Sequence, residues 1–217
     1  MLKVVSLLIM AFSFSACAQT TYTSTGKDKL GPHPFERRVK FHKTDALYTM
    51  APDCIVIWSN ELAIKKSQLL LVETAIFRHL SVKVDRVISP RQRDRIALTA
   101  GLDLKNPKDK KYFSKSQRCG FELNIMSALT ASDYLLVWSQ NKVSLDLSLR
   151  KITTGVELWR AQHTGKRGHG GIALTPLSIG MNAFEASRSS ADRDELPSII
   201  DDTLRRMFVT LPDFRIN

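Results

Sequence analysis

The side chains that could bind a metal or attack a substrate are those of three cysteines and five histidines. The histidines are His33, His42, His79, His163 and His169. No two of them stand in the HxxxH, HExxH or cysteine-histidine spacing that a zinc or catalytic metal site requires. His163 and His169 with Met181 could hold a soft metal, but histidines in glycine-flanked loops are more often solvated. We therefore expect no metal and no other cofactor.

Motifs for the common enzyme chemistries are also missing from the sequence. The segment RGHGG at 167–171 could supply an oxyanion hole, but that role needs a GxSxG nucleophile elbow, which the sequence lacks. No Walker loop occurs, and no GxGxxG follows an expected strand. Carboxylates at 191–195 and 201–202 stand at the start of an expected helix, where they complement its dipole. We expect a protein that is not an enzyme and that acts by contact.

The first 16 residues have the three parts of a secretory signal peptide. Lys3 supplies the positive charge, an apolar run extends from Val4 to Phe14, and the small residues Ser15 and Ala16 follow. A helix needs about 20 apolar residues to span a bilayer core of about 30 Å. This run is shorter, so it predicts a signal peptide over 1–16 rather than an anchor helix.

Cys17 directly follows the small residues. Ser15, Ala16 and Cys17 resemble the lipobox of bacterial lipoproteins, in which the cysteine thiol is acylated and becomes the mature N-terminus. Phe14 departs from that pattern, since leucine is usual there, and an ordinary signal peptide cut near the same place is the alternative. Ala18 follows the cysteine directly. In having no acidic residue at this position, the sequence resembles lipoproteins sorted to the outer membrane. The resemblance implies an outer-membrane lipid anchor at Cys17, with the domain facing the periplasm.

Cys54 and Cys119 remain as an even pair if Cys17 carries lipid, in a compartment that oxidises thiols. A disulfide between them would close a loop of about 65 residues and stabilise the fold by a few kcal/mol. Cys54 also lies in an apolar run, where a buried free thiol fits as well. Both interpretations stay open at the level of the sequence.

The 217-residue chain has a net charge of +11, spread along segments without interleaved aromatic residues. Behind a secretion signal, the available polyanions are lipid headgroups, lipopolysaccharide and acidic exopolysaccharide rather than nucleic acid. We expect a solvated basic surface and no nucleic-acid partner.

Hydrophobic patterning predicts one domain behind a linker. Residues 17–34 are polar and broken by glycine and proline, as in a flexible tether, and residues 35–217 form a single domain. Within it, Ser89 caps a helix that Gly101 stops. In the first half of the domain we expect strand 53–59, helix 61–80, strand 84–89, a helix from Pro90, a loop or a frayed turn at 105–116, and at 122–132 a helix that runs into the next strand.

The clearest strand signal lies at 143–150, where apolar and polar residues alternate. With strands at 134–139 and 156–162, it predicts a three-strand antiparallel meander over 134–162. An amphipathic segment with acidic residues early and basic residues late predicts a C-terminal helix at about 195–211. The sum is an α/β fold, an α+β sandwich with helices packed on a mixed sheet.

The phrases SDYLLVWS and LRKITTGVELWRA, with the alternating strand between them, resemble a signature of periplasmic lipoproteins. These are the lipoproteins related to the curli-secretion channel (CsgG-like) and the neisserial-type lipoproteins, built on a TolB-N-like α/β domain. The matching residues are Asp133, Tyr134, Leu135, 143–149, Thr154, Gly155, Leu158 and Trp159. In such a hairpin Gly155 takes a positive φ and Trp159 packs an apolar face of the sheet.

The uncharged segment 168–184 is similar to the small-residue apolar insert of the neisserial-type group. Its large apolar residues include Ile172, Leu174, Leu177, Ile179 and Phe184. Such an insert could contact a membrane or a neighbouring subunit, and a buried loop over the sheet is the alternative.

Together these features predict an outer-membrane lipoprotein that helps to assemble or operate an envelope export system for protein fibres or polysaccharide, as a homo-oligomer. The alternative is a tethered periplasmic regulator that activates a partner cell-wall enzyme, as the activator lipoproteins of penicillin-binding proteins do on a similar fold. Their tethers are typically longer than the roughly 17 residues here, which span at most about 55 Å.

Overall fold

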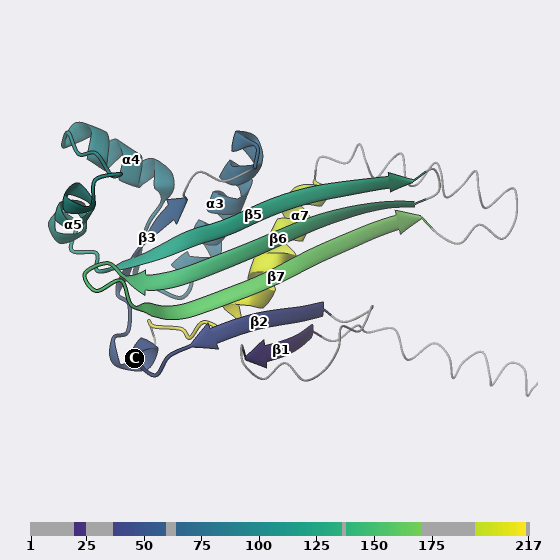
Figure 1. The fold of residues 1–217 in the computed structure, drawn as a ribbon, viewed down its shortest axis with the longest axis horizontal. Coiled ribbons are helices and arrows are strands. Elements are labelled where there is room, and N and C mark those ends of the chain that lie inside the picture. Colours follow the sequence, from purple (N-terminus) through teal and green to yellow (C-terminus); the bar gives the residue numbers. More distant parts are fainter. Residues whose placement is uncertain (1–19, 25–36, 60–63, 136–137, 171–193, 216–217) are drawn as a thin grey trace, which may run out of the picture.

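The computed structural model describes residues 20–24, 37–59, 64–135, 138–170 and 194–215. Over these residues the chain forms one seven-stranded mixed sheet and five helices, which confirms the expected fold class (Figure 1). The strands are β1 (Thr20–Ser24), β2 (Arg37–Lys43), β3 (Cys54–Ser59), β4 (Arg86–Ile88), β5 (Phe121–Leu135), β6 (Trp138–Lys151) and β7 (Glu157–Gly170). The helices are α2 (Ala46–Thr49), α3 (Lys66–Ser81), α4 (Pro90–Thr99), α5 (Pro107–Ser116) and α7 (Glu195–Phe208).

The strand order across the sheet is β1-β2-β7-β6-β5-β3-β4. The antiparallel meander of β5, β6 and β7 forms its centre, and β2 continues it antiparallel to β7. β1 pairs in parallel with β2, and β3 lies in parallel between β5 and β4. The expected meander is therefore present, and it runs from Phe121 to Gly170 rather than from 134 to 162.

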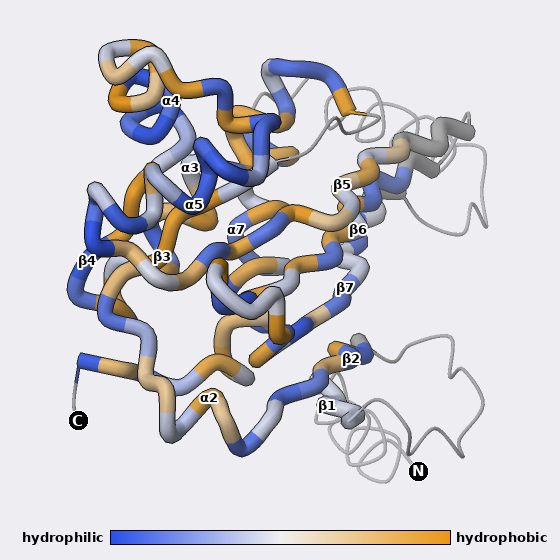
Figure 2. The backbone as a smooth tube through the Cα atoms, turned by 60° about the vertical axis from the view of Figure 1, so that its left-hand side comes forward, coloured by the Kyte–Doolittle hydropathy of each residue, from blue (hydrophilic) through white to orange (hydrophobic). Residues whose placement is uncertain are grey.

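Helices α3 and α7 cover one face of the sheet and enclose the main core. Leu145, Leu147 and Leu149 point to that face from β6, while Ile76 of α3 and Leu204 of α7 pack against them. Hydrophobic and hydrophilic residues alternate along the meander strands in Figure 2. This period of two gives the sheet one buried and one polar face.

A second, smaller core lies on the opposite face at β3, under α4 and α5. Cys54, Val56 and Trp58 of β3 meet Phe113 of α5 and Ile88 of β4 there. The alternate residues of β3 belong to the main core. Because β3 is buried on both faces, its sequence is a continuous apolar run without alternation.

Several expected elements of the first half are confirmed at nearly the expected bounds. β3 and β4 lie within 53–59 and 84–89, and α3 begins five residues later than the expected helix. The Ser89 hydroxyl accepts a hydrogen bond of 3.3 Å from the amide of Gln92 at the start of α4. Gly101 follows that helix with φ of +64°, a backbone conformation that favours glycine.

Two expectations for 105–132 were wrong. The lysine-rich 105–116 is neither a loop nor a frayed turn, because it contains helix α5. The helix begins at Pro107, and the Asn106 side chain caps it by accepting a 3.0 Å hydrogen bond from the amide of Lys108. Residues 122–132 are not a helix but part of β5, paired with β3 on one side and β6 on the other. These long-range ladders outweigh the local preference of Ala128 and its neighbours.

The ends of the meander strands also differ from the expected bounds. There is no separate strand at 134–139 within the described residues: Tyr134 and Leu135 end β5, and Trp138 and Ser139 begin β6. The hairpin between β5 and β6 therefore falls inside that expected strand. The apolar run YLLVW continues across the boundary between the two strands, so the sequence shows no break there.

The sheet begins inside the segment that the sequence assigns to a tether. Thr20–Ser24 form β1, an edge strand paired over five positions with β2. The Thr20 hydroxyl also accepts a hydrogen bond from the guanidinium of Arg206 in α7. Patterning predicted neither β1 nor β2, because both strands are short and rich in polar residues.

Candidate functional site

The polar face of the meander is a broad surface that could bind a partner. We call it the open face: the side of β5, β6 and β7 opposite α3 and α7. Among the described elements, α4 and α5 cover this side only at β3 and the start of β5. The alternation of 143–150 places its polar residues here, and the pairing register adds every second residue of β7.

Asp146 of β6 lies on the open face, where two side chains of β7 donate hydrogen bonds to its carboxylate. Arg160 donates to it through Nε at 3.0 Å and Nη2 at 2.7 Å, and Gln162 donates through Nε2 at 2.8 Å. The hydrogen bond to Asp146 raises the pKa of Arg160 above its ordinary value. This bidentate geometry fixes the side chains of Arg160 and Asp146, and the guanidinium neutralises the charge of the carboxylate.

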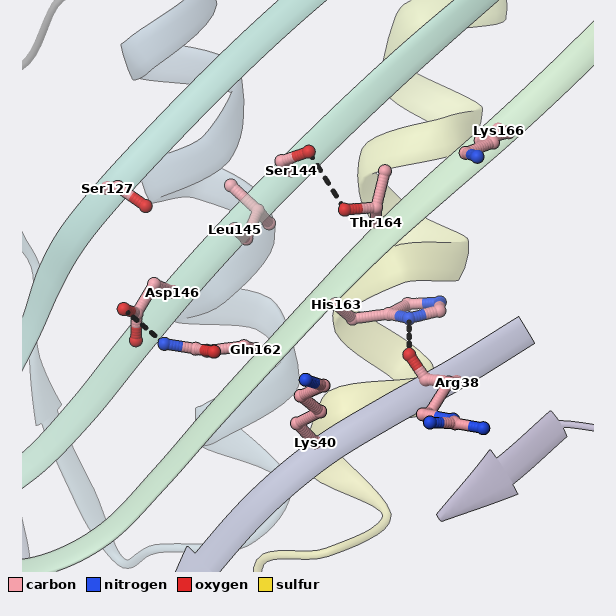
Figure 3. A pocket seen from close by; sticks show the side chains of 10 residues that line it. All are labelled: Arg38, Lys40, Ser127, Ser144, Leu145, Asp146, Gln162, His163, Thr164 and Lys166. Atoms are coloured by element: carbon pink, nitrogen blue, oxygen red, sulfur yellow. Dashed lines mark hydrogen bonds between the residues drawn. The ribbon is translucent and has the colours of Figure 1, made fainter. Parts of the chain in front are cut away.

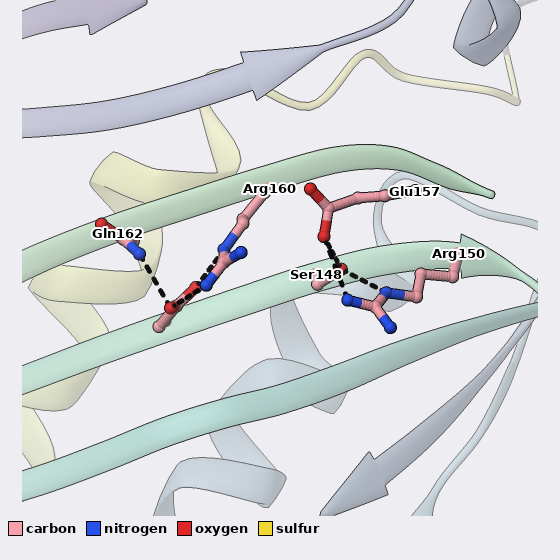
Figure 4. Close-up of polar contacts among 6 residues, drawn as sticks. Ser148, Arg150, Glu157, Arg160 and Gln162 are labelled. Atoms are coloured by element: carbon pink, nitrogen blue, oxygen red, sulfur yellow. Dashed lines mark hydrogen bonds and ion pairs between the residues drawn. The ribbon is translucent and has the colours of Figure 1, made fainter. Parts of the chain in front are cut away.

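The other carboxylates near Asp146 also have hydrogen-bond donors and basic side chains beside them. Ser148 donates to Glu157 at 2.6 Å, and Arg150 reaches the same carboxylate at 3.3 Å (Figure 4). Lys110 of α5 lies 2.5 Å from Glu122 at the start of β5. These acidic groups of the open face are therefore tied into the sheet, and they resemble structural ion pairs rather than a catalytic pair.

A shallow pocket of about 470 Å³ lies farther along the same face (Figure 3). Arg38 and Lys40 of β2 and Lys166 of β7 bring cations to its lining. Ser144 and Thr164 bring hydroxyls that are 2.9 Å apart and bonded to each other. Among the described lining residues the carboxylate is that of Asp146, already paired with Arg160, so the pocket offers cations and hydroxyls to an anionic or heavily hydroxylated ligand.

His163 lies behind this pocket as a structural residue. It is 5% exposed, and its Nδ1–H donates to the carbonyl oxygen of Arg38 at 2.9 Å, which ties β7 to β2 (Figure 3). The soft-metal site considered for His163 also needs Met181 and the side chain of His169, which lie outside the part of the structure that is described. Over the described residues no three His, Cys, Asp or Glu side chains gather as metal ligands would.

Cys54 and Cys119 form a disulfide, with 1.98 Å between the sulfur atoms and 5.0 Å between the Cα atoms. Both are buried, at 2% and 1% exposed, in the smaller core. The bond joins β3 to the residue just before Gly120 and β5, and it closes a loop of 65 residues. Cys17, the expected lipidation site, lies outside the described residues.

The two residues of the family-like hairpin lie where a tight turn and a core need them. Gly155 has φ of +71° in the turn between β6 and β7 and donates to the carbonyl oxygen of Lys151 at 2.8 Å. Trp159 is fully buried, stacks on Phe208 with 5.8 Å between ring centroids, and donates through Nε1 to Thr210 at 2.9 Å. Trp159 therefore holds α7 against the sheet, and neither residue lines the pocket.

The apolar insert predicted to contact a membrane or another subunit lies outside the described residues. Its residues are Ile172, Leu174, Leu177, Ile179 and Phe184. Among the residues that are described, no helix combines the length and the apolar character needed to cross a bilayer.

Sequence reasoning missed two groups of charged residues. Arg38 and Lys40 were not assigned to the sheet, although basic residues alternate with Val39 and Phe41 in RRVKFHK. Arg93 and Lys110 lie over the ring of Trp58, at 4.7 Å and 4.5 Å from its centroid. No sequence signal places these two, because they come from separate helices.

Comparisons with known proteins give only distant structural likenesses. No protein-family model matches the chain, and no curated protein matches it. A dodecamer of a single-substitution PelC variant from Paraburkholderia phytofirmans is 12% identical with a TM-score of 0.42, covering 78% of this chain and 95% of that one. Lipoprotein GNA1162 from Neisseria meningitidis is 15% identical at 0.43, covering 64% and 99%. The LpoB C-terminal domain from Salmonella enterica is 11% identical at 0.29, covering 56% and 84%. At these values the likenesses carry no functional argument.

Proposed function

We propose that this chain is an outer-membrane lipoprotein, acylated at Cys17, whose domain works without catalysis as a homo-oligomeric component of an envelope export system. The exported material is a protein fibre or a polysaccharide. The N-terminal sequence supports the anchor: an apolar run, two small residues, Cys17 and then Ala18. The hairpin with Gly155 and Trp159 supports the likeness to lipoproteins of the curli-channel type.

The observation that carries the proposal is the pairing of cysteines. The sequence has three, and Cys54 and Cys119 are joined inside the smaller core. A disulfide of this kind belongs to a compartment outside the cytoplasm. Cys17 is then the one cysteine outside the disulfide. It stands at the end of a secretion signal, at the position where lipoproteins are acylated.

The open face supports a role in contact. Its carboxylates are held by Arg160, Arg150 and Lys110, and its pocket is broad and shallow rather than enclosed. Enzyme sites usually bury most of their ligand and hold groups with strongly shifted pKa values. A flat, polar and charged sheet face suits a long polymer or another protein better.

The position of β1 favours export over the tethered regulator. Only Ala18 and Gln19 separate Cys17 from the first residue of β1. From Cys17 to Thr20 the chain spans at most about 10 Å, whatever its conformation, instead of the about 55 Å of a free tether. A domain held so near the bilayer cannot reach far across the periplasm to a cell-wall enzyme.

Two measurements test the proposed function. The native mass of the full chain, extracted from membranes in mild detergent, gives its oligomeric state, and we expect a defined multimer. Deletion of the chain in its host should reduce polysaccharide or fibres at the cell surface, and a Cys17→Ser copy should not restore them. A monomer together with unchanged surface polymer and altered cell-wall synthesis would favour the regulator instead.

A further inference from the structure

A second pocket, of about 400 Å³, lies where α5 meets the turn between β6 and β7. We call it the α5 pocket. Lys111, Ser114, Lys115 and Arg118 line it from α5 and the end of that helix, and Ile152 and Thr153 line it from the turn. It shares no lining residue with the pocket of the open face, so it is a separate site.

The walls of the α5 pocket are bonded to one another. The disulfide fixes Cys119 to β3. The Ser114 hydroxyl donates to the carbonyl oxygen of Cys119, and the amide of Ile152 donates to the carbonyl oxygen of Gly120 at 2.9 Å. Because the helix, the link to β5 and the turn are held together, a ligand meets a preformed site and little order is lost or gained when it binds.

The surface of the α5 pocket is almost entirely apolar, although three of its residues are cationic. Lys111, Lys115 and Arg118 are exposed, so their aliphatic stems form the wall and their charged ends stand at the rim. Ile152, which is half-buried, adds an apolar side chain on the opposite wall. The pocket therefore combines an apolar interior with a positively charged rim.

The three cations of the rim have no acidic partner within the part of the chain that the structure describes. The carboxylates on and beside α5 have other contacts. Asp109 accepts a hydrogen bond of 3.0 Å from a backbone amide, and Glu122 lies 2.5 Å from Lys110. The rim can therefore attract an anion from outside the chain.

Arg118 has a backbone conformation that is unfavourable for arginine. The amide of Cys119 donates to the carbonyl oxygen of Ser114 at 2.9 Å, and that of Arg118 to Lys115 at 3.1 Å, which is the Schellman motif of a helix end. The motif holds Arg118 at φ of +50°, in the position where glycine is usual. Residues held in such conformations cluster at functional sites, where the side chain is needed.

The α5 pocket lies away from the expected membrane anchor. The pairing of Thr20 with Arg37 and of Val39 with His163 places the start of β1 roughly 30 Å along β7 from Gly155 in the turn. In Figure 1 α5 and this turn lie together at one end of the sheet, away from the start of β1. The short connection to the anchor therefore does not bring this pocket to the bilayer.

We propose that the α5 pocket binds an acidic segment of a partner protein, which inserts one apolar side chain between Ile152 and the lysine stems and places flanking carboxylates on Lys111, Lys115 and Arg118. An acidic polysaccharide offers the carboxylates but no apolar group for the interior. The inference rests on the proposed function in one respect, because the anchor at Cys17 is what sets the pocket apart from membrane lipid.

The test measures the binding of labelled peptides to the full chain in mild detergent by fluorescence anisotropy. The probe is the capped peptide EEDLDEE, and we expect saturable binding that weakens at high salt. EEDSDEE keeps the charge and lacks the apolar side chain, so it should bind at least about tenfold more weakly. QQNLNQQ keeps the leucine without the charge and should also bind more weakly.

Two double variants locate the binding. Lys111→Gln with Lys115→Gln removes two cations of the rim and should weaken binding of EEDLDEE at least about fivefold. Arg91→Gln with Lys108→Gln removes two exposed cations that do not line the pocket, and it should leave the affinity unchanged. If the first double variant does not fold, the contrast between the peptides on the wild-type chain decides.

Arg118→Gly separates binding from folding. Glycine relieves the positive φ, so the Tm should rise by about 2–4 °C. The same variant loses a cation of the rim and should bind EEDLDEE about threefold more weakly. A higher Tm with unchanged affinity would contradict the contact between Arg118 and the acidic segment.

Four outcomes would overturn the proposal. They are equal affinity for EEDLDEE and EEDSDEE, equal losses in the two double variants, displacement of the peptide by alginate at an equal concentration of carboxylate, and tighter binding of octanoate than of the peptide. The N-terminal mass of the same sample keeps this proposal apart from the proposed function. A chain without lipid contradicts the anchor, whereas a lipidated chain that does not bind the peptide contradicts the α5 pocket alone.

Discussion

Arg206, in the last turns of α7, hydrogen-bonds the hydroxyl of Thr20, which is three residues after Cys17 in the chain. The same guanidinium donates through Nε to Asp202 at 2.8 Å, and the Arg206 side chain is only 14% exposed. The C-terminal helix therefore holds the first described residue of the domain. Because of this contact, only Ala18 and Gln19 separate Cys17 from a residue that is bonded to the domain, in place of the flexible tether expected over 17–34.

Arg206→Gln should release β1 from the sheet, because the edge strand has neighbours on one side only. We expect the amides of 20–24 to exchange with deuterium at least about tenfold faster, while those of β6 stay protected. Arg205→Gln is the matched control, since it removes the other arginine on Asp202. Equal exchange of 20–24 in both variants and in the wild type would show that Arg206 does not hold β1.

Gly165→Ala should destabilise the packing of α7 on β7. A Cβ at Gly165 would lie 2.1 Å from Oγ1 of Thr203 and 3.2 Å from Cγ2 of Ile199, so these side chains or the helix that carries them must shift. Such overpacking costs about 1–3 kcal/mol of the free energy of unfolding. Urea denaturation measures it. Gly120→Ala, where a Cβ meets nothing within 4 Å, should change stability by less than about 0.5 kcal/mol.

The Gly165 variant offers an internal check through its neighbour. Thr203→Ala removes the clashing hydroxyl, so the double variant should regain part of the stability that Gly165→Ala loses. If the two substitutions instead lower the free energy of unfolding by fully additive amounts, the added methyl group does not clash with the Thr203 hydroxyl.

Removal of the disulfide by Cys54→Ala with Cys119→Ala should lower the free energy of unfolding by about 4 kcal/mol, the chain-entropy value for a loop of this length. Thermal unfolding with and without reductant measures the effect. Reductant should lower the Tm of the wild type and leave that of the double variant unchanged. An equal response of both proteins would contradict a structural disulfide.

Asp201 should contribute to stability at neutral pH and lose that contribution in acid. Burial alone would raise the pKa of Asp201, but hydrogen bonds from His79 and Arg78 bring the pKa below its ordinary value of 3.8. Because folding favours the charged carboxylate, its contribution is present above about pH 4 and lost as the pH falls below that. The side chain is 42% exposed, so the effect stays within the about 0.2–1 kcal/mol of surface pairs.

Asp201→Asn should accordingly be less stable than the wild type at pH 7, and the difference should shrink at pH 3. Urea unfolding at the two pH values measures it. Asp85→Asn, which removes a carboxylate from an exposed loop position, is the control. A difference that grows in acid would contradict the role of Asp201.

The sequence predicted those elements whose period or caps are strong. The alternation at 143–150, the cap of Ser89 and the amphipathic C-terminal helix all lie where expected. β5 was mistaken for a helix because its small residues have little strand preference, and its pairing with β3 and β6 decides its conformation. The alternation of Phe121, Leu123 and Ile125 with polar neighbours is the signal that could have identified it.

The candidate site was predicted only in part, since it depends on long-range register. The polar face of β6 follows from its own alternation, but Arg160 and Gln162 meet Asp146 only through the pairing with β7. Arg38 and Lys40 reach the pocket through β2, a short strand with a mostly polar sequence that lies between the edge strand β1 and β7. No local pattern encodes which strands become neighbours.

The mass of the N-terminal tryptic peptide from membrane-extracted protein tests the central claim most directly. We expect a peptide that begins at Cys17, ends at Lys27 and carries acyl chains. Cys17→Ser should abolish both the acyl mass and the extraction with membranes. An unmodified mature N-terminus at any other residue would contradict the lipid anchor, and with it the placement of this domain at the membrane surface.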